Sequence, residues 1–183
     1  SPYIPLADTF DNWLASIDKK QRHEIRRKLR NADANYQLNF YNMHDYQNCK
    51  EEIDLFLEMM RNEHEKDLFL KPEMVTFMQD AAHNACTEGR LVLSFLELDG
   101  QKAASYLSFK NGKALLVYNS GFEPQFFSAS PGWVLLAKLI EWAIGQGFDE
   151  VDMMRGDEEY KYRFGGVNRY VHRLRLTPSK ASS

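Results

Sequence analysis

The sequence has few cysteines and no long apolar run. Cys49 and Cys86 are the two cysteines among 183 residues, too few for a disulfide framework or a cysteine-rich zinc site. No stretch approaches the run of about 20 apolar residues that spans a bilayer, and no secretory signal opens the chain. We therefore expect a cytoplasmic protein without a membrane segment and without a metal.

The sequence also lacks an excess of charge of one sign. The net charge is −3, from 23 Lys and Arg against 26 Asp and Glu residues, which argues against bulk electrostatic binding of nucleic acid. Apolar residues make up 44% of the chain and charged residues 27%, as in ordinary globular proteins. A chain of this length is expected to form one domain, with a basic helical lead-in over 1–34, a core over 35–176 and a tail over 177–183.

Apolar residues at strand and helix spacing, separated by glycine-containing turns, predict a mixed order of elements after an extended start at 1–6. Asp99-Gly100 and Asn111-Gly112 are strong hairpin signals. The expected strands are 36–41, 91–98, 101–110, 113–119, 151–154 and 170–176. The expected helices are 10–17, 19–30, 45–63, 72–89 and 131–145, with a further helical segment near 157–164.

Basic residues gather between Lys19 and Arg30. Such a cluster is able to hold a phosphate, a polyanion or RNA. The alternative is a solvated helix face in which Ile25 and Leu29 alone are packed. The sequence leaves both interpretations open.

The segment from Tyr118 to Arg163 carries the main functional signal. Ser130 is expected to cap a helix, with Pro131 at its first position. The first turn of a helix has unpaired N–H groups and the positive end of the dipole, and Gly132 allows an anion to approach the backbone. A pyrophosphate is the expected guest, although the same tripeptide also starts ordinary helices.

The order of elements and these motifs resemble the GNAT acetyltransferase superfamily, and more specifically its CelD-like branch. That branch is named from cellulose biosynthesis and is related to the FemAB-type peptidyltransferases. The resemblance covers nearly the whole chain, which looks like the C-terminal half of such a protein. It rests on Tyr118-Asn119-Ser120-Gly121-Phe122, Ser130-Pro131-Gly132 with Leu135-Leu136, Gly147-Phe148-Asp149, Val151-Asp152 and the run from Gly156 to Phe164.

The resemblance implies an α+β fold in α/β/α layers: a GNAT fold with a central mixed, mostly antiparallel sheet and helices on both faces. It also implies a preceding domain of similar fold. The implied activity is direct transfer of an acetyl or other acyl group from acyl-CoA to an amine or hydroxyl acceptor.

The resemblance also implies where acetyl-CoA binds. The pantetheine arm would lie where Val117–Ser120 separates from Val151–Met154, and the pyrophosphate would lie at the helix start. One departure is clear, because the Arg/Gln-x-x-Gly-x-Gly/Ala loop of typical GNAT enzymes is absent. The implied cofactor-binding residues are Tyr118, Asn119, Ser120, Ser130, Pro131, Gly132 and Trp133.

Direct transfer needs a proton to leave the acceptor and a proton to reach the thiolate. The resemblance implies that Tyr160 protonates the thiolate, because GNAT enzymes often have a tyrosine at this place; the alternative is that Tyr160 packs under the loop. Asp152 and Glu158 are the nearest carboxylates for a base, although Asp152 is equally suited to tie the Gly156 loop. Lys161 is expected to contact a phosphate or an acceptor carboxylate, or to pair with Glu158.

Two other functions stay open. A FemAB-like transferase that uses aminoacyl-tRNA would benefit from the basic helix, while the net negative charge counts against it. A non-catalytic binding or scaffold domain would explain the absent glycine-rich loop.

Overall fold

The computed structural model describes residues 1–43, 48–172 and 174–175. The strands are β1 (Pro2–Pro5), β2 (Leu38–Asn42), β3 (Leu91–Leu98), β4 (Gln101–Asn111), β5 (Ala114–Phe122), β6 (Glu150–Asp152) and β7 (Val167–Asn168). The helices are α1 (Phe10–Ser16), α2 (Lys19–Asn35), α3 (Cys49–Arg61), α4 (His64–Phe69), α5 (Pro72–Thr87), the 3-10 helix η2 (Pro124–Ala129), α6 (Pro131–Gly145) and α7 (Glu159–Arg163).

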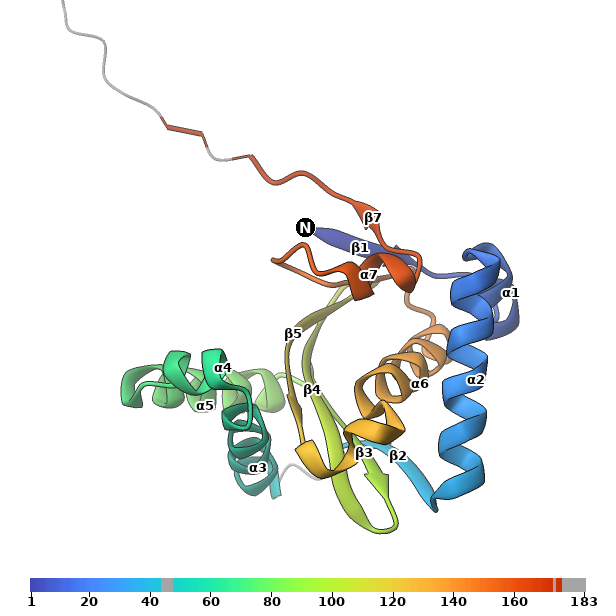
Figure 1. Cartoon of the computed structure of the whole chain (residues 1–183). Helices are drawn as coiled ribbons and strands as arrows, with labels where there is room; N and C mark the ends of the chain where they lie inside the picture. Colours follow the sequence, from blue (N-terminus) through green and yellow to red (C-terminus); the bar gives the residue numbers. More distant parts are fainter. Residues whose placement is uncertain (44–47, 173, 176–183) are drawn as a thin grey trace, which may run out of the picture.

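Within the described residues the strands form a seven-stranded sheet in the order β2-β3-β4-β5-β6-β1-β7. Neighbouring strands are antiparallel except for β5 and β6, which are parallel. Helices α2 and α6 lie on one side of the sheet and α3, α4 and α5 on the other (Figure 1). The predicted α/β/α layering and the mixed, mostly antiparallel sheet are confirmed.

Each face of the sheet has its own apolar core. On one face Trp13, Ile25 and Ile140 from α1, α2 and α6 are buried against the strands. On the other face Phe56 of α3 packs with Phe95 of β3. Because apolar side chains fill both faces, the sheet is covered on both sides, and functional groups collect at its ends and in the gap between separating strands.

The predicted hairpins and the crossover helix are confirmed. Asp99 and Gly100 adopt positive φ values of 52° and 77°, and Gly112 one of 58°, as tight hairpin turns require. The helix after Pro131 buries the expected apolar face. Gly147, with φ of 76°, follows its end in the left-handed conformation expected of a helix stop.

Several boundaries differ from the prediction. The extended start is strand β1, which lies in the sheet between β6 and β7. The final strand is Val167–Asn168 because these residues pair with β1, whereas Tyr170 and Val171 are exposed and outside any strand. Helix α4 was not predicted. Parts of the predicted 45–63 helix and 170–176 strand, and the tail over 177–183, fall outside the described residues.

The separation of β5 from β6 positions the site. These strands pair at three positions, from Ala114 opposite Glu150 to Leu116 opposite Asp152. Beyond Leu116, β5 continues to Phe122 along β4, with Tyr118 as an extra residue between the pairs Leu107–Asn119 and Ser108–Val117. The sequence prediction ended this strand at Asn119 and was therefore too short. The free edge of β5 faces open space because β6 has ended.

In the part of the chain that the structure describes, no helix is both long and apolar enough to cross a membrane.

Candidate functional site

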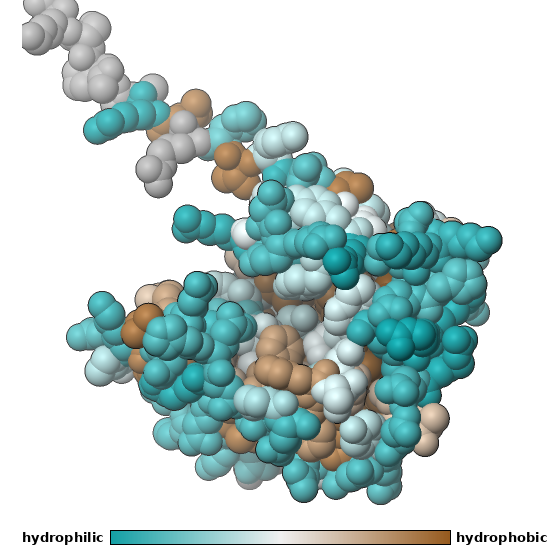
Figure 2. Space-filling model, viewed as in Figure 1, coloured by the Kyte–Doolittle hydropathy of each residue, from teal (hydrophilic) through white to brown (hydrophobic). Residues whose placement is uncertain are grey.

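A cavity of about 360 Å³ lies where β5 and β6 separate. Figure 2 shows this hollow on the face of the molecule, with pale and brown atoms inside and hydrophilic atoms around it. Residues 117–120 and 122 of β5 line one wall, and the first turn of α6 lines another. The rest comes from Tyr106 of β4, from Glu63 and Lys66, and from six residues between Met153 and Phe164. The site is assembled from segments that are distant in the sequence.

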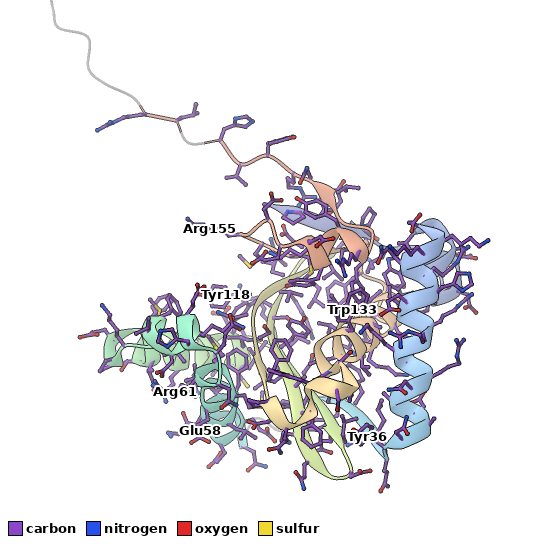
Figure 3. All side chains as sticks on the ribbon, in the orientation of Figure 1. Tyr36, Glu58, Arg61, Tyr118, Trp133 and Arg155 are labelled. Atoms are coloured by element: carbon purple, nitrogen blue, oxygen red, sulfur yellow. The ribbon has the colours of Figure 1, made fainter. Side chains whose placement is uncertain are left out.

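The structure brings most of the residues implied for cofactor binding together. Tyr118, Asn119, Ser120, Gly132 and Trp133 all line the cavity. Figure 3 places Trp133 between β5 and α2, in the middle of the opening. Ser130 and Pro131 do not line this cavity, and lie just outside it at the start of α6.

The start of α6 differs from the predicted serine cap. Ser130 adopts φ 53° and ψ 52°, and its side chain caps no helical N–H. Ser130 is both the last cap of η2 and the first cap of α6, and the change of direction between the two helices at this single residue requires its left-handed conformation. Its Oγ instead accepts a hydrogen bond of 2.7 Å from the Lys28 ammonium, which lies 5.1 Å from the centre of the Trp133 ring. Ser130 is therefore the N-cap residue and Pro131 the first helical position, as predicted, but the expected hydrogen bond from a helical N–H to the serine side chain is not made.

Gly132 is needed for packing at the same helix start. A Cβ atom on this residue would lie 2.8 Å from Cε1 of Phe122, closer than two carbon atoms can pack. The ring of Phe122 therefore sits directly against the backbone of the first turn, and together they close one side of the cavity.

Lys161 is a buried cation that ties the loop before α7. Its side chain is 3% exposed and pairs with Glu158 at 2.8 Å. The ammonium also donates hydrogen bonds to the carbonyl oxygens of Met153 and Arg155, at 2.9 and 3.0 Å. A longer contact of 3.4 Å reaches the carbonyl of Gly156. These bonds satisfy the buried charge and fix the loop that forms the cavity wall.

The two carboxylates considered as bases differ in position. Glu158 lines the cavity; partial burial acts against ionisation, but hydrogen bonds and the charge of Lys161 lower the pKa of Glu158. Asp152 does not line the cavity, and accepts hydrogen bonds of 2.7 Å from the Met154 N–H and 3.3 Å from Arg169. These contacts match the structural role that the sequence left open for Asp152.

Two tyrosine hydroxyls face the cavity. Burial, followed by the charges of Glu158 and Glu63, raises the pKa of Tyr160 to about 12. Burial also raises the pKa of Tyr106 well above its usual value. Among the described residues neither hydroxyl has a hydrogen-bond partner, although Tyr106 is 4% exposed. Both stay protonated at neutral pH and are able to donate to a ligand.

Sequence reasoning missed several residues of the site: Glu63, Lys66, Tyr106 and Arg155. Lys28 belongs to the basic cluster, but nothing in its spacing distinguishes it from its neighbours. The contact of Lys66 with Ser120 joins residues 54 positions apart, which no local pattern reveals. Over the described ranges, no group of three or more His, Cys, Asp or Glu residues is arranged to hold a metal.

The sequence was compared with protein families and with curated proteins. A family model described as an acetyltransferase (GNAT) domain matches residues 19–162. No curated protein matches the sequence. The match to the family model supports the GNAT fold that the sequence predicted.

Solved structures give the same fold at low sequence identity. FemX superimposes with a TM-score of 0.67 at 13% identity, over 91% of this chain and 58% of FemX. The C-terminal domain of a putative lysylphosphatidylglycerol synthetase from Agrobacterium fabrum gives 0.57 at 11% identity, over 90% of this chain and 55% of that one. A predicted acetyltransferase from Clostridium acetobutylicum, solved with acetyl-CoA, gives 0.54 at 14% identity, over 77% and 96%.

The chain therefore spans less than two thirds of the length of the first two structures. At these identities the likeness is one of fold. It confirms the GNAT fold, while membership of the CelD-like branch stays a prediction.

Proposed function

Because this chain belongs to the acetyltransferase (GNAT) domain family, we propose that it transfers an acyl group, acetyl in the simplest case, from acyl-CoA to an amine or hydroxyl acceptor. The observation that carries this proposal is the cavity between the separated strands β5 and β6. A hydroxyl donor, Tyr160, lies on one of its walls and a helix N-terminus on another.

The residues at the start of α6 suit the pyrophosphate. Pro131 has no N–H, and the N–H groups of Trp133 and Val134 donate to the carbonyl oxygen of Ser130, which leaves the Gly132 N–H and the positive end of the helix dipole to meet an anion. The Lys28 ammonium beside Ser130 adds positive charge at the same point and also pairs with Glu24 at 3.5 Å. We propose that Lys28 supplies the charge that the absent Arg/Gln-x-x-Gly-x-Gly/Ala loop would have supplied.

The free edge of β5 suits the pantetheine arm. Its residues 117–119 run past the end of β6, so their backbone groups on that edge have no strand partner, whereas the carbonyl and N–H of Ser120 already bond to Lys66 and to the Asn119 side chain. Peptide N–H and C=O groups of this kind pair readily with the amides of pantetheine. A backbone N–H near the Tyr118 bulge would stabilise the negative charge that develops on the acyl oxygen.

Tyr160 is the proposed proton donor to the departing thiolate. With its pKa raised to about 12, the hydroxyl carries its proton at neutral pH. Glu158 and Lys161 hold the wall next to it through their ion pair. Asp152 is proposed to act from outside the cavity, by fixing the loop that starts at Met154.

We further propose that the protein works in the cytoplasm, where acyl-CoA is available, and that the full-length protein carries a preceding domain of similar fold. The partial coverage of FemX supports the second point. The CelD-like branch is the proposed subgroup.

Calorimetric titration with acetyl-CoA and CoA, with a thermal melt alongside, tests the cofactor. We expect micromolar binding and a higher melting temperature, because a ligand that binds only the folded state stabilises it. A folded chain that binds neither compound up to millimolar concentration would contradict the proposal.

Lys28→Met tests the pyrophosphate site. We expect about a 10-fold loss of CoA affinity, since a charge-assisted contact is removed. Acetyl-pantetheine, which lacks the pyrophosphate, should bind the variant and the unchanged chain equally. Lys20→Met is the matched control, because Lys20 is exposed on the same helix. If Lys28→Met lost affinity for CoA and for acetyl-pantetheine equally, Lys28 would not bind the pyrophosphate.

A FemAB-like transferase that takes its group from aminoacyl-tRNA is the second candidate. The structural likeness to FemX and the exposed Lys19, Lys20 and Arg30 of α2 favour it. Several neighbouring cations are paired, however, as Arg27 is with Glu24. Salt-dependent binding of tRNA by this chain, together with no binding of CoA, would favour this candidate.

A further inference from the structure

A second cavity, of about 390 Å³, adjoins the first. The two share Glu63, Lys66, Ser120 and Phe122 in their walls. Beyond this junction the second cavity is lined by the apolar Met59, Met60 and Phe127, of which Phe127 is 61% exposed, and by Gly121, Asn62 and His64. An acceptor bound there would have an apolar part in the second cavity and a reactive end directed into the first.

Glu63 is held at the junction by Lys66. The Lys66 ammonium donates to the carbonyl oxygen and the hydroxyl of Ser120, at 2.9 and 3.1 Å, and pairs with Oε2 of Glu63 at 2.8 Å. The ammonium also lies 5.4 Å from the centre of the Phe122 ring. Oε1 of Glu63 makes no hydrogen bond within the part of the chain that the structure describes. One carboxylate oxygen is fixed and the other is free to accept from a ligand.

Glu63 also faces the proposed proton donor. Its charge is one of the causes that raise the pKa of Tyr160, and both residues line the first cavity. The other charged or titratable groups in the walls of the two cavities are His64, Lys66, Tyr106, Tyr118, Arg155, Glu158 and Lys161. Lys66 is bound to Ser120, and Lys161 and Glu158 are bound to each other. A base and an acid thus stand on two sides of the space where the acyl group would be transferred.

We propose that Glu63 is the general base of the transfer reaction and that the acceptor is a primary amine carrying an apolar group, which occupies the cavity lined by Met59, Met60 and Phe127. This inference rests on the proposed acyltransferase function. It differs from the sequence interpretation, which considered Asp152 and Glu158 as bases.

The proton balance of the step is complete with these residues. The amine nitrogen forms a bond to the acyl carbon while the bond from that carbon to sulfur breaks. Glu63 takes the proton that the nitrogen loses, and Tyr160 gives its phenolic proton to the thiolate. Return of the proton from Glu63 to the Tyr160 oxygen through solvent restores both groups. The products are an amide and free CoA.

Glu63→Gln is the first test, with acetyl-CoA and phenethylamine as substrates and released thiol as the readout. We expect kcat to fall by about 100-fold or more, since a positioned base contributes at least that much. Acetyl-CoA affinity by calorimetry should be unchanged. Glu58→Gln is the matched control, because Glu58 is exposed on the outer side of α3 (Figure 3).

The pH profile separates a base from a merely structural residue. In the unchanged chain we expect kcat/KM, calculated on the concentration of unprotonated amine, to fall on the acid side, and this fall should disappear in Glu63→Gln. If His64→Asn removes the acid limb instead, the base is His64 and the assignment of Glu63 is wrong. A structural role for Glu63 would lower the rate at all pH values and leave the limb in place.

The acceptor class is tested by comparing phenethylamine with ethanolamine. Burial of the aromatic ring should favour phenethylamine by about 10-fold or more in kcat/KM. Phe127→Ser should reduce this preference, whereas Phe77→Ser should not. Phe127 and Phe77 are similarly exposed, at 61% and 59%, but Phe77 lies on α5 outside the cavity.

Failure of the acyltransferase proposal and failure of the acceptor and base assignments give different results. If acetyl-CoA is not bound at all, the proposed function fails. If acetyl-CoA is bound but neither amine is acetylated, or ethanolamine is preferred, the acceptor class is wrong. If Glu63→Gln keeps full turnover, Glu63 is not the base.

Discussion

Tyr160 and Lys161 are adjacent residues that burial affects in different ways. The hydroxyl of Tyr160 is left without a hydrogen-bond partner among the described residues and retains its proton. Lys161 is buried but surrounded by one carboxylate and several carbonyl oxygens. The first arrangement suits exchange with a ligand and the second suits a fixed wall, because a buried charge with all its bonds made has little to offer a substrate.

Tyr160→Phe is expected to lower kcat by about 10- to 100-fold while acetyl-CoA affinity stays within a factor of two, since the variant removes only the proton donor. Steady-state rates and calorimetry on the same samples check this. Tyr162→Phe is the control, because the Tyr162 hydroxyl bonds to Asp157 and Asn168 and does not line the cavity. Unchanged turnover with saturating substrates would remove the proton-donor role.

At the residue scale, the cavity residues of β5, α6 and α7 could be predicted from the sequence, whereas Glu63 and Lys66 could not. Tyr118, Trp133 and Tyr160 were identified because they sit within ordered motifs of a single strand-helix-strand segment. Glu63 and Lys66 follow a helix that has no such motif, and the fold alone brings them to Ser120. Contacts of this kind depend on packing between elements, which local sequence does not encode.

Among the elements, β5 is constrained from both sides. One edge opens into the cavity, while α3 packs so closely that a Cβ on Gly121 would lie 2.7 Å from the Met59 Cβ and 2.9 Å from two backbone atoms of the helix. Backbone atoms cannot move aside as a flexible side chain does. The glycine therefore sets the distance between α3 and the strand, and with it the position of the second cavity.

Gly121→Ala should destabilise the protein by about 2 kcal/mol, because relief of the overlap requires a shift of the whole helix. Urea unfolding checks this. Gly145→Ala is the matched control at the end of α6, where an added Cβ would meet nothing within 4 Å; it should be neutral or stabilising by up to about 1 kcal/mol. Equal stability of the two variants would show that α3 moves freely on the sheet.

Helices and strands with characteristic turn residues or an apolar periodicity were predicted correctly. Those that form only because they pair or pack with other elements were not predicted. The hairpins have Asp-Gly and Asn-Gly turns, and α6 has Pro131 and a wide apolar face. Strand β1 is four residues long and contains two prolines, so only its pairing with β6 and β7 defines it. Helix α4 has six residues and no buried side chain, which leaves no periodic pattern to detect.

For the whole molecule, acid should weaken the fold. Hydrogen bonds from Arg27 lower the pKa of Glu24 from 4.5 to about 2, and the pKa of Asp54 is also lowered, mainly by Lys50. A carboxyl group whose pKa is lower in the folded state stabilises it above the unfolded pKa, and this stabilisation is lost as the pH falls through the folded pKa.

The free energy of unfolding should therefore fall as the pH is lowered from 5 to 2. Glu24→Gln should flatten this dependence by about 1 kcal/mol, a value reduced by solvent screening because the pair is partly exposed. Urea unfolding at several pH values measures the slope. A slope unaffected by Glu24→Gln would contradict the prediction.

We expect the short pairing of β5 with β6 to divide the sheet into two cooperative units, one of β2 to β5 and a smaller one of β6, β1 and β7. Strands β2 to β5 pair over long stretches, while β6, β1 and β7 join them through three residue pairs and through the core that Ile4 and Val151 share with α6. Such a seam allows the smaller unit to open without global unfolding, and its amides to exchange with deuterium faster than those of β3 and β4. A ligand that contacts both β5 and the β6 side of the cavity would couple the two units. Its binding should therefore slow amide exchange even in strands that it does not contact.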